Sequence, residues 1–97
     1  MLCDEIKKIF EIAKQKNATD IHLCAHAPIL FRIGDDLIPM NETVLTSDVS
    51  KKLSYDLMNN DQIKTFEDDL DIDFMLAYHQ NRYRINISFN DGTSDRF

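Results

Sequence analysis

The feature that most constrains the fold is an alternation of large apolar residues with other residues near the end of the chain. Apolar residues occupy every second position of 72–78 and again of 83–89, and His79-Gln80-Asn81 separates the two runs. Successive side chains of a strand point to opposite faces, so this pattern predicts an antiparallel hairpin. One face should pack on a core, while the other presents Arg82, Arg84 and Asn86.

The rest of the chain predicts three helices and three further strands. Residues 2–16 have the spacing of an amphipathic helix that stops near Asn17. Strands are expected at about 20–25 and 28–33. A short strand at 36–39 should follow, and Pro39 would restrict it to the edge of the sheet. Thr46 should cap a helix that ends at Asn59-Asn60, which in turn cap another helix reaching about residue 70.

Two local expectations complete this outline. The almost unbroken apolar run at 28–33 predicts a strand covered on both faces, with Arg32 paired or near an end. Asn90-Asp91-Gly92 predicts a second turn, and 93–97 the beginning of another strand. The expected class is mixed α/β (α+β), with a mainly antiparallel sheet flanked by an N-terminal helix and a central helix pair.

The composition of the chain argues against several classes of function. A chain of 97 residues corresponds to one domain, and its net charge of −6 argues against nucleic acid as a partner. No apolar run approaches the length of a membrane span, and the first residues do not resemble a signal peptide, so we expect a cytoplasmic protein. Two cysteines without a metal-binding spacing are typical of a reducing compartment.

Enzymatic motifs are missing from the sequence. Gly34 and Gly92 are the only glycines, so a phosphate-binding loop of the G-x-x-x-x-G-K-[ST] type cannot be present. No nucleophile–base arrangement is evident either. We therefore expect no catalytic residues and no enzymatic activity in this chain.

A line of potential metal ligands runs along the first predicted strand. His22, Cys24 and His26 would share one side of an extended segment, and His79 could supply a fourth zinc ligand. The alternative is a half-buried strand face with small polar groups. We favour this alternative and predict no metal site.

Arg82 and Arg84 are the strongest candidates for binding. Both fall on one face of a predicted strand, and the planar guanidinium group suits phosphate or carboxylate recognition. The alternative is solvation of the sheet face, or ion pairing with Asp71 and Asp73 on the neighbouring strand.

Six segments resemble, in the same order, the N-terminal domain of the type II/IV secretion ATPases, and within that family the branch that retracts type IV pili in twitching motility. The opening segment, Ala18-Thr19-Asp20-Ile21-His22-Leu23, resembles the A-[ST]-D-[IL]-H-[LI] signature of this domain. The others are Pro28-Ile29-Leu30-Phe31-Arg32-Ile33-Gly34-Asp35-Asp36-Leu37, Tyr55-Asp56-Leu57-Met58-Asn59, Phe66-Glu67, Asp71-Ile72-Asp73-Phe74 and Arg82-Tyr83-Arg84-Ile85-Asn86.

This resemblance implies a PAS-like domain, covering residues 1–97, that precedes a RecA-like motor domain not contained in this sequence. In the family, ATP and magnesium bind between the two domains, and six subunits form a hexameric ring. By position, Arg84 and, less directly, Arg82 would contact the nucleotide phosphates, and this chain would hold no cofactor by itself.

The implied partners are the missing motor domain, neighbouring subunits of the ring and, indirectly, the inner-membrane platform of the pilus. The assembled protein would be cytoplasmic and peripheral to the inner membrane. The alternative function is a stand-alone PAS-like module for sensing or protein interaction.

Overall fold

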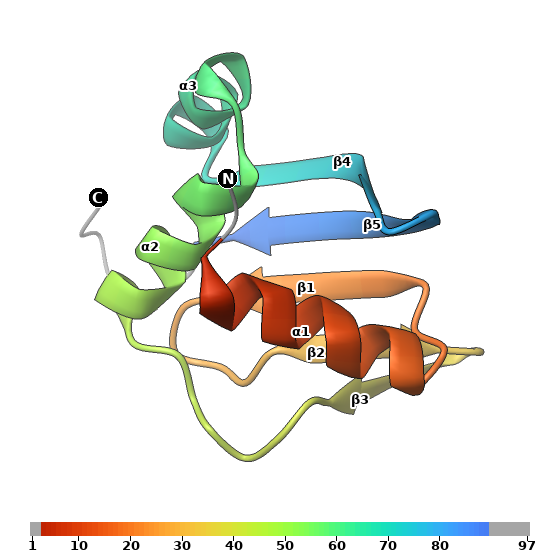
Figure 1. Cartoon of the computed structure of the whole chain (residues 1–97). Helices are drawn as coiled ribbons and strands as arrows, with labels where there is room; N and C mark the ends of the chain where they lie inside the picture. The colour runs from red at the N-terminus through yellow and green to blue at the C-terminus, as the bar shows by residue number, and fades with distance from the viewer. Residues whose placement is uncertain (1–2, 90–97) are drawn as a thin grey trace.

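The computed structural model describes residues 3–89, which form one five-stranded sheet with three helices (Figure 1). In chain order the elements are α1 (Asp4–Gln15), β1 (Asp20–Cys24), β2 (Leu30–Ile33), β3 (Asp36–Pro39), α2 (Ser47–Leu57), α3 (Asn60–Asp69), β4 (Asp71–Tyr78) and β5 (Asn81–Ser88). The strand order is β3-β2-β1-β5-β4, and only the β1–β5 pair is parallel. The expected mixed class with a mainly antiparallel sheet is confirmed. The turn and strand expected at 90–92 and 93–97 lie outside the described residues.

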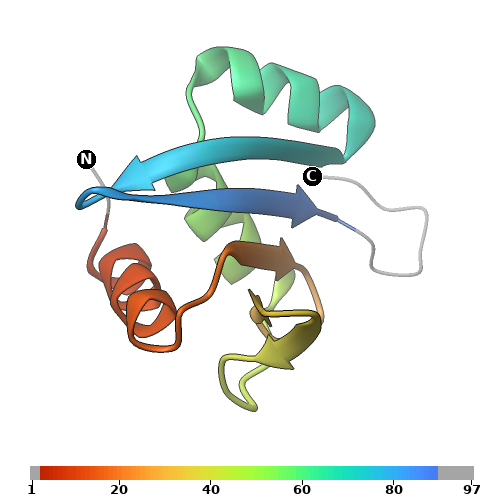
Figure 2. The same cartoon turned by 90° about the vertical axis from the view of Figure 1, so that its right-hand side faces the viewer.

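The core lies between one face of the sheet and the helices α1 and α2, which both lie on that side (Figures 1 and 2). Alternate residues of the inner strands point into it and are buried: Ile21, Leu23, Phe31, Tyr83, Ile85 and Ile87. From α1 the buried residues are Ile6, Ile9, Phe10 and Ala13. The helix α3 lies beside β4, and Phe66 is its buried residue. None of the described helices is long and apolar enough to cross a bilayer.

The expectation that β2 is covered on both faces is wrong. Its core-facing Phe31 is fully buried, but Arg32 lies on the opposite face, where its side chain keeps 39% of its exposure. There the Arg32 Nε atom lies 3.8 Å from the Asp20 carboxylate, so the expected pairing of Arg32 is present. Leu30 lies on the same face as Arg32 and is only half-buried. The apolar run in the sequence therefore includes a residue that is not part of the core.

The end of α1 positions the start of β1. Asn17 adopts a left-handed backbone conformation with φ of 60°, which ends the helix. The amide of Ala18 then donates to the carbonyl of Ala13 at 2.9 Å. The amide of Asn17 donates to the carbonyl of Lys14 at 3.2 Å. Two of the last helical carbonyls are thereby satisfied within the chain. At the other end, the Cys3 amide donates to the Asp56 carboxylate of α2 at 2.6 Å.

The helix pair has the expected caps. The Thr46 hydroxyl accepts from the Val49 amide at 3.2 Å, and Asn59 forms a reciprocal capping box with Gln62. Between the helices, the Tyr55 hydroxyl of α2 donates to the Glu67 carboxylate of α3 at 2.7 Å. Burial, and then the hydrogen bond and charge of Glu67, raise the pKa of Tyr55 to about 12.

The raised pKa of Tyr55, caused first by burial and then by Glu67, predicts a loss of stability in alkali. A tyrosine whose pKa is raised on folding favours the folded state below its ordinary pKa of 10, and this contribution disappears as the pH rises to about 12. We expect the stability difference between the parent and Tyr55→Phe to shrink by about 1–2 kcal/mol over this range, after allowance for solvent screening. Urea unfolding at pH 8 to 12 measures it. Parallel pH curves for the two proteins would contradict the prediction.

Candidate functional site

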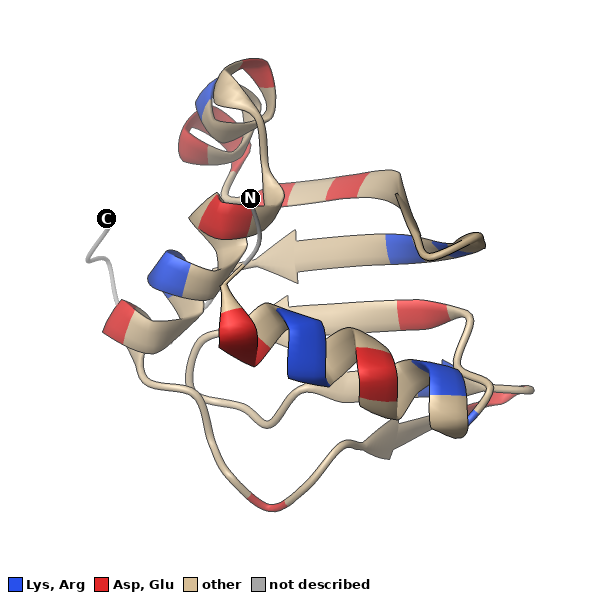
Figure 3. Cartoon of the chain, viewed as in Figure 1, with Lys and Arg blue, Asp and Glu red and all other residues tan. Residues whose placement is uncertain are grey.

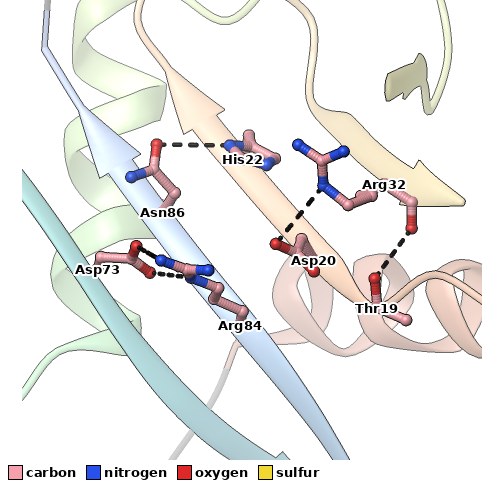
Figure 4. Close-up of polar contacts among 7 residues, drawn as sticks. All are labelled: Thr19, Asp20, His22, Arg32, Asp73, Arg84 and Asn86. Carbon is pink, nitrogen blue, oxygen red and sulfur yellow. Dashed lines mark hydrogen bonds and ion pairs between the residues drawn. The ribbon is translucent and has the colours of Figure 1, made fainter. Parts of the chain in front are cut away.

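The sheet face opposite the core carries a cluster of polar side chains from four strands (Figure 4). The parallel register sets Asp20 opposite Arg84 and His22 opposite Asn86, while β4 brings Asp73 opposite Asn86. We call this cluster the open polar face; its members are Asp20, His22, Arg32, Asp73, Arg84 and Asn86. It includes Arg84, one of the two arginines expected from the sequence to contact phosphates.

Arg84 is held by a carboxylate. Its Nε atom donates to Asp73 Oδ1 at 2.9 Å and Oδ2 at 3.0 Å, and its Nη2 atom donates to Oδ2 at 2.5 Å. The ion pairing considered from the sequence is therefore present, with Asp73 as the partner. This hydrogen bonding lowers the pKa of Asp73 and raises that of Arg84. The Arg84 side chain is still 59% exposed, so the pair lies at the surface.

Arg82 lies on the same face of β5 but in different surroundings. It lines a pocket of about 420 Å³ together with Lys14, Asn17, Thr19 and Asn81. Among residues 3–89, its side chain has no hydrogen bond or ion pair. Figure 3 shows basic positions at the end of α1 and at the start of β5, and an acidic position at the start of β1. The structure thus separates the two arginines that the sequence had grouped together.

The zinc ligands that were considered and not favoured from the sequence do not converge. The Nδ1 atom of His22 lies 3.4 Å from Asn86 Oδ1, on the open polar face. His26 falls after β1, in a left-handed conformation with φ of 63°, and its Nε2 atom lies 3.1 Å from the Ser47 hydroxyl. The expectation that all three share one side of an extended strand is therefore wrong for His26, because β1 ends at Cys24. Within the described part of the chain, no group of three potential ligands could hold a metal ion.

A second, mostly apolar pocket lies on the helical side of the molecule. Its volume is about 570 Å³, and Ile9 and Ile12 of α1, Leu45, and Val49 and Leu53 of α2 are among its lining residues. This pocket was not predicted, because its walls come from segments whose patterns are those of ordinary core elements. It bears on the alternative of a ligand-binding sensory module.

Comparison with known proteins shows which proteins the chain is similar to. No family model matches it. It is 32% identical over 87 residues to the type IV pilus retraction ATPase PilT of Pseudomonas aeruginosa, a match that covers 89% of this chain and 25% of the relative. It also superposes on a crystal structure of the pilus retraction motor PilT with bound ADP, with a TM-score of 0.69 and 29% identity over 91% of this chain and 26% of the other. The chain thus spans about a quarter of the length of both matches. By sequence and by fold, it corresponds to the N-terminal domain of the PilT-type pilus retraction ATPases.

Proposed function

We propose that this domain works with a RecA-like motor domain as a nucleotide-responsive clamp in a type IV pilus retraction motor. The observation that carries the proposal is the strand β5, which presents Arg82 and Arg84 on one exposed face. The matched proteins are a retraction ATPase and a motor with bound ADP, which supports nucleotide phosphate as the ligand of this face. In this proposal residues 1–97 form a single domain without catalytic residues, and ATP and magnesium are bound in the assembled motor.

The Arg84–Asp73 pair suggests how the clamp would respond to nucleotide. Without phosphate, the guanidinium group is occupied by the Asp73 carboxylate. A phosphate carries more negative charge and offers more acceptor oxygens than one carboxylate, so it competes for the arginine. The exchange would draw this domain toward the motor domain as a rigid body. Neighbouring subunits of a hexameric ring would then transmit the movement to the pilus platform at the cytoplasmic side of the inner membrane.

The test joins this chain to the motor domain of the Pseudomonas relative, in place of that protein's own N-terminal domain. Loss of one charge-assisted hydrogen-bonded contact is worth about 1.5–3 kcal/mol, so Arg84→Ala or Arg82→Ala should lower ATP turnover at least about 10-fold. Lys16→Ala, which removes an exposed charge at the end of α1, is the control. Turnover and ring assembly that stay unchanged in both arginine variants would contradict the clamp.

The apolar pocket favours a second function, that of a PAS-like module that binds a small ligand. Its volume of about 570 Å³ lies within the usual range of ligand sites, and its walls are largely aliphatic. Native mass spectrometry of the purified chain tests this function. A copurified ligand that is lost on Leu53→Gln would support it, and an unliganded mass together with full ATP turnover in the joined motor would reject it.

A further inference from the structure

The helices α1 and α2 meet at one end and separate toward the other. Where they meet, the Cys3 amide donates to the Asp56 carboxylate at 2.6 Å, and the Lys52 ammonium lies 3.9 Å from the Glu5 carboxylate. From there the two helices run apart (Figure 1). The apolar pocket of about 570 Å³ has both helices among its walls, so it lies in the space that their separation opens.

The segment between β3 and α2 forms a third wall of the apolar pocket. The Met40 amide donates to the Ile29 carbonyl at 2.7 Å, and the Leu45 amide donates to the Ala27 carbonyl at 3.0 Å. Both ends of the segment 40–45 are thereby fastened to the chain that leads into β2. Met40, Leu45 and Ile29 all line the pocket. This wall is therefore part of the fold, and the pocket is a recess with three sides.

Apolar and polar side chains are separated within the apolar pocket. Ile9, Ile29 and Leu53 are nearly buried, with 6%, 4% and 3% exposure. No aromatic ring is among the described residues that line the pocket. Its polar lining residues are all exposed: Glu5, Lys8, Asn41 and Lys52. A ligand with an aliphatic body and one polar end matches this division.

The rim of the apolar pocket favours a negative polar end. Glu5 is paired with Lys52, whereas the Lys8 ammonium has no ion pair within residues 3–89. Two lysines and one glutamate give the described lining a charge of +1, in a chain whose net charge is −6. The Asn41 Oδ1 atom accepts from the Thr43 amide at 3.0 Å, so the Asn41 side-chain nitrogen is the part that can donate to a ligand. This rim therefore suits an anionic headgroup.

The size and charge of the apolar pocket argue against larger occupants. Two turns of α-helix fill a cylinder of roughly 850 Å³, which exceeds the pocket volume of about 570 Å³. A bilayer of anionic lipid attracts clusters of several basic residues. A recess with one unpaired lysine, in a chain with a net charge of −6, offers no such cluster. The observations therefore favour a single small amphiphile.

We propose that the apolar pocket binds a single-chain aliphatic carboxylate, with its chain on the buried floor and its carboxylate at Lys8. The ligand class rests on the second function proposed above. The carboxylate accepts from the Lys8 ammonium and from the Asn41 side-chain nitrogen. The aliphatic chain covers Val49, a lining residue of α2 that is 43% exposed, and removes this apolar surface from water.

Nuclear magnetic resonance of the 97-residue chain tests the inference, with decanoate, decanol, decylammonium and butyrate as probes. Decanoate should shift the amides of 5–12, 40–45 and 49–53 in a saturable way. Decylammonium should bind more weakly because its charge has the wrong sign. Butyrate should cause no such shift because its chain is too short to cover the floor.

Variants separate the contribution of the headgroup from that of the chain. Lys8→Gln should weaken decanoate binding roughly 3- to 10-fold and leave decanol binding unchanged. Val49→Gln should weaken the binding of both probes, because it removes apolar contact. Lys7→Gln, which removes a neighbouring charge of α1 outside the pocket lining, should bind decanoate like the parent.

Three results would overturn the inference: no saturable shift with decanoate, decanoate binding that Lys8→Gln leaves unchanged, or decylammonium binding as tight as that of decanoate. The last two would keep a ligand-binding module and reject carboxylate as its ligand class. Shifts of the same amides that follow protein concentration without a probe would indicate a second copy as the occupant. Binding to phosphatidylglycerol vesicles without binding to decanoate would indicate a membrane, and both results reject the inference. The second function itself fails only through the native mass and turnover measurements, and the clamp is independent of all these results.

Discussion

Replacement of Phe66 by alanine is expected to lower the free energy of unfolding by about 3–5 kcal/mol. Phe66 has 0% exposure and is the only residue of α3 that is fully buried. Its removal leaves a cavity where α3 joins the core, and the remaining contacts of this short helix are half-buried. Urea unfolding followed by circular dichroism gives the change, and a loss of this size is a large share of the ~5–15 kcal/mol typical of a domain.

Lys64→Ala on the same helix is the matched control. Lys64 is exposed, so its replacement should change the stability by no more than about 0.5 kcal/mol. Amide exchange adds a second readout, because Phe66→Ala should increase exchange in α3 more than in β5. Equal stability of the Phe66 and Lys64 variants would show that α3 does not depend on this ring.

Replacement of Phe10 by alanine should have an effect of the same order, about 3–5 kcal/mol. The Phe10 ring is stacked on Tyr78 with 4.6 Å between centroids and 13° between planes, and it lies 5.2 Å from the Tyr83 ring. These contacts connect α1 to both strands of the hairpin. Near-ultraviolet circular dichroism should lose intensity along with the stability, since two tyrosines lose their ring neighbour.

Phe10→Leu separates the ring geometry from simple burial. Leucine keeps most of the apolar contact but loses the aromatic pairs, which contribute about 0.5–1.5 kcal/mol beyond their buried area. We therefore expect a clearly smaller loss than in Phe10→Ala. If leucine were as destabilising as alanine, shape and not buried area would decide the packing of α1.

Local sequence rules predicted most of the fold. Thr46 and Asn59 were recognisable as helix caps, because short polar side chains before a helix have one strongly preferred role. The hairpin followed from its alternation, although its turn is tighter than expected. His79 and Gln80 both adopt positive φ, 48° and 71°, so Asn81 already belongs to β5. Neither residue is glycine, and the side chains alone therefore gave no sign of a two-residue turn.

The candidate site was only partly predictable, because it depends on register and on distant segments. Alternation placed Arg82 and Arg84 on one face, but it could not decide between Asp71 and Asp73 as the partner of Arg84. Lys14 was missed altogether, since only the parallel pairing of β1 with β5 brings the end of α1 beside Arg82. A parallel pair of strands far apart in sequence leaves no local signal.

The same parallel pair determines when the domain can fold during synthesis. The antiparallel half made of β1, β2 and β3 leaves the ribosome first, and β5 follows only after the helix pair and β4. At about 5–20 residues per second, the distance from Cys24 to Ser88 corresponds to roughly 3–13 seconds of translation. Throughout this time β1 has an unpaired edge of the kind that promotes association between chains. The nascent polypeptide is therefore most vulnerable to aggregation before the hairpin emerges, and the pairing of β5 with β1 ends this period.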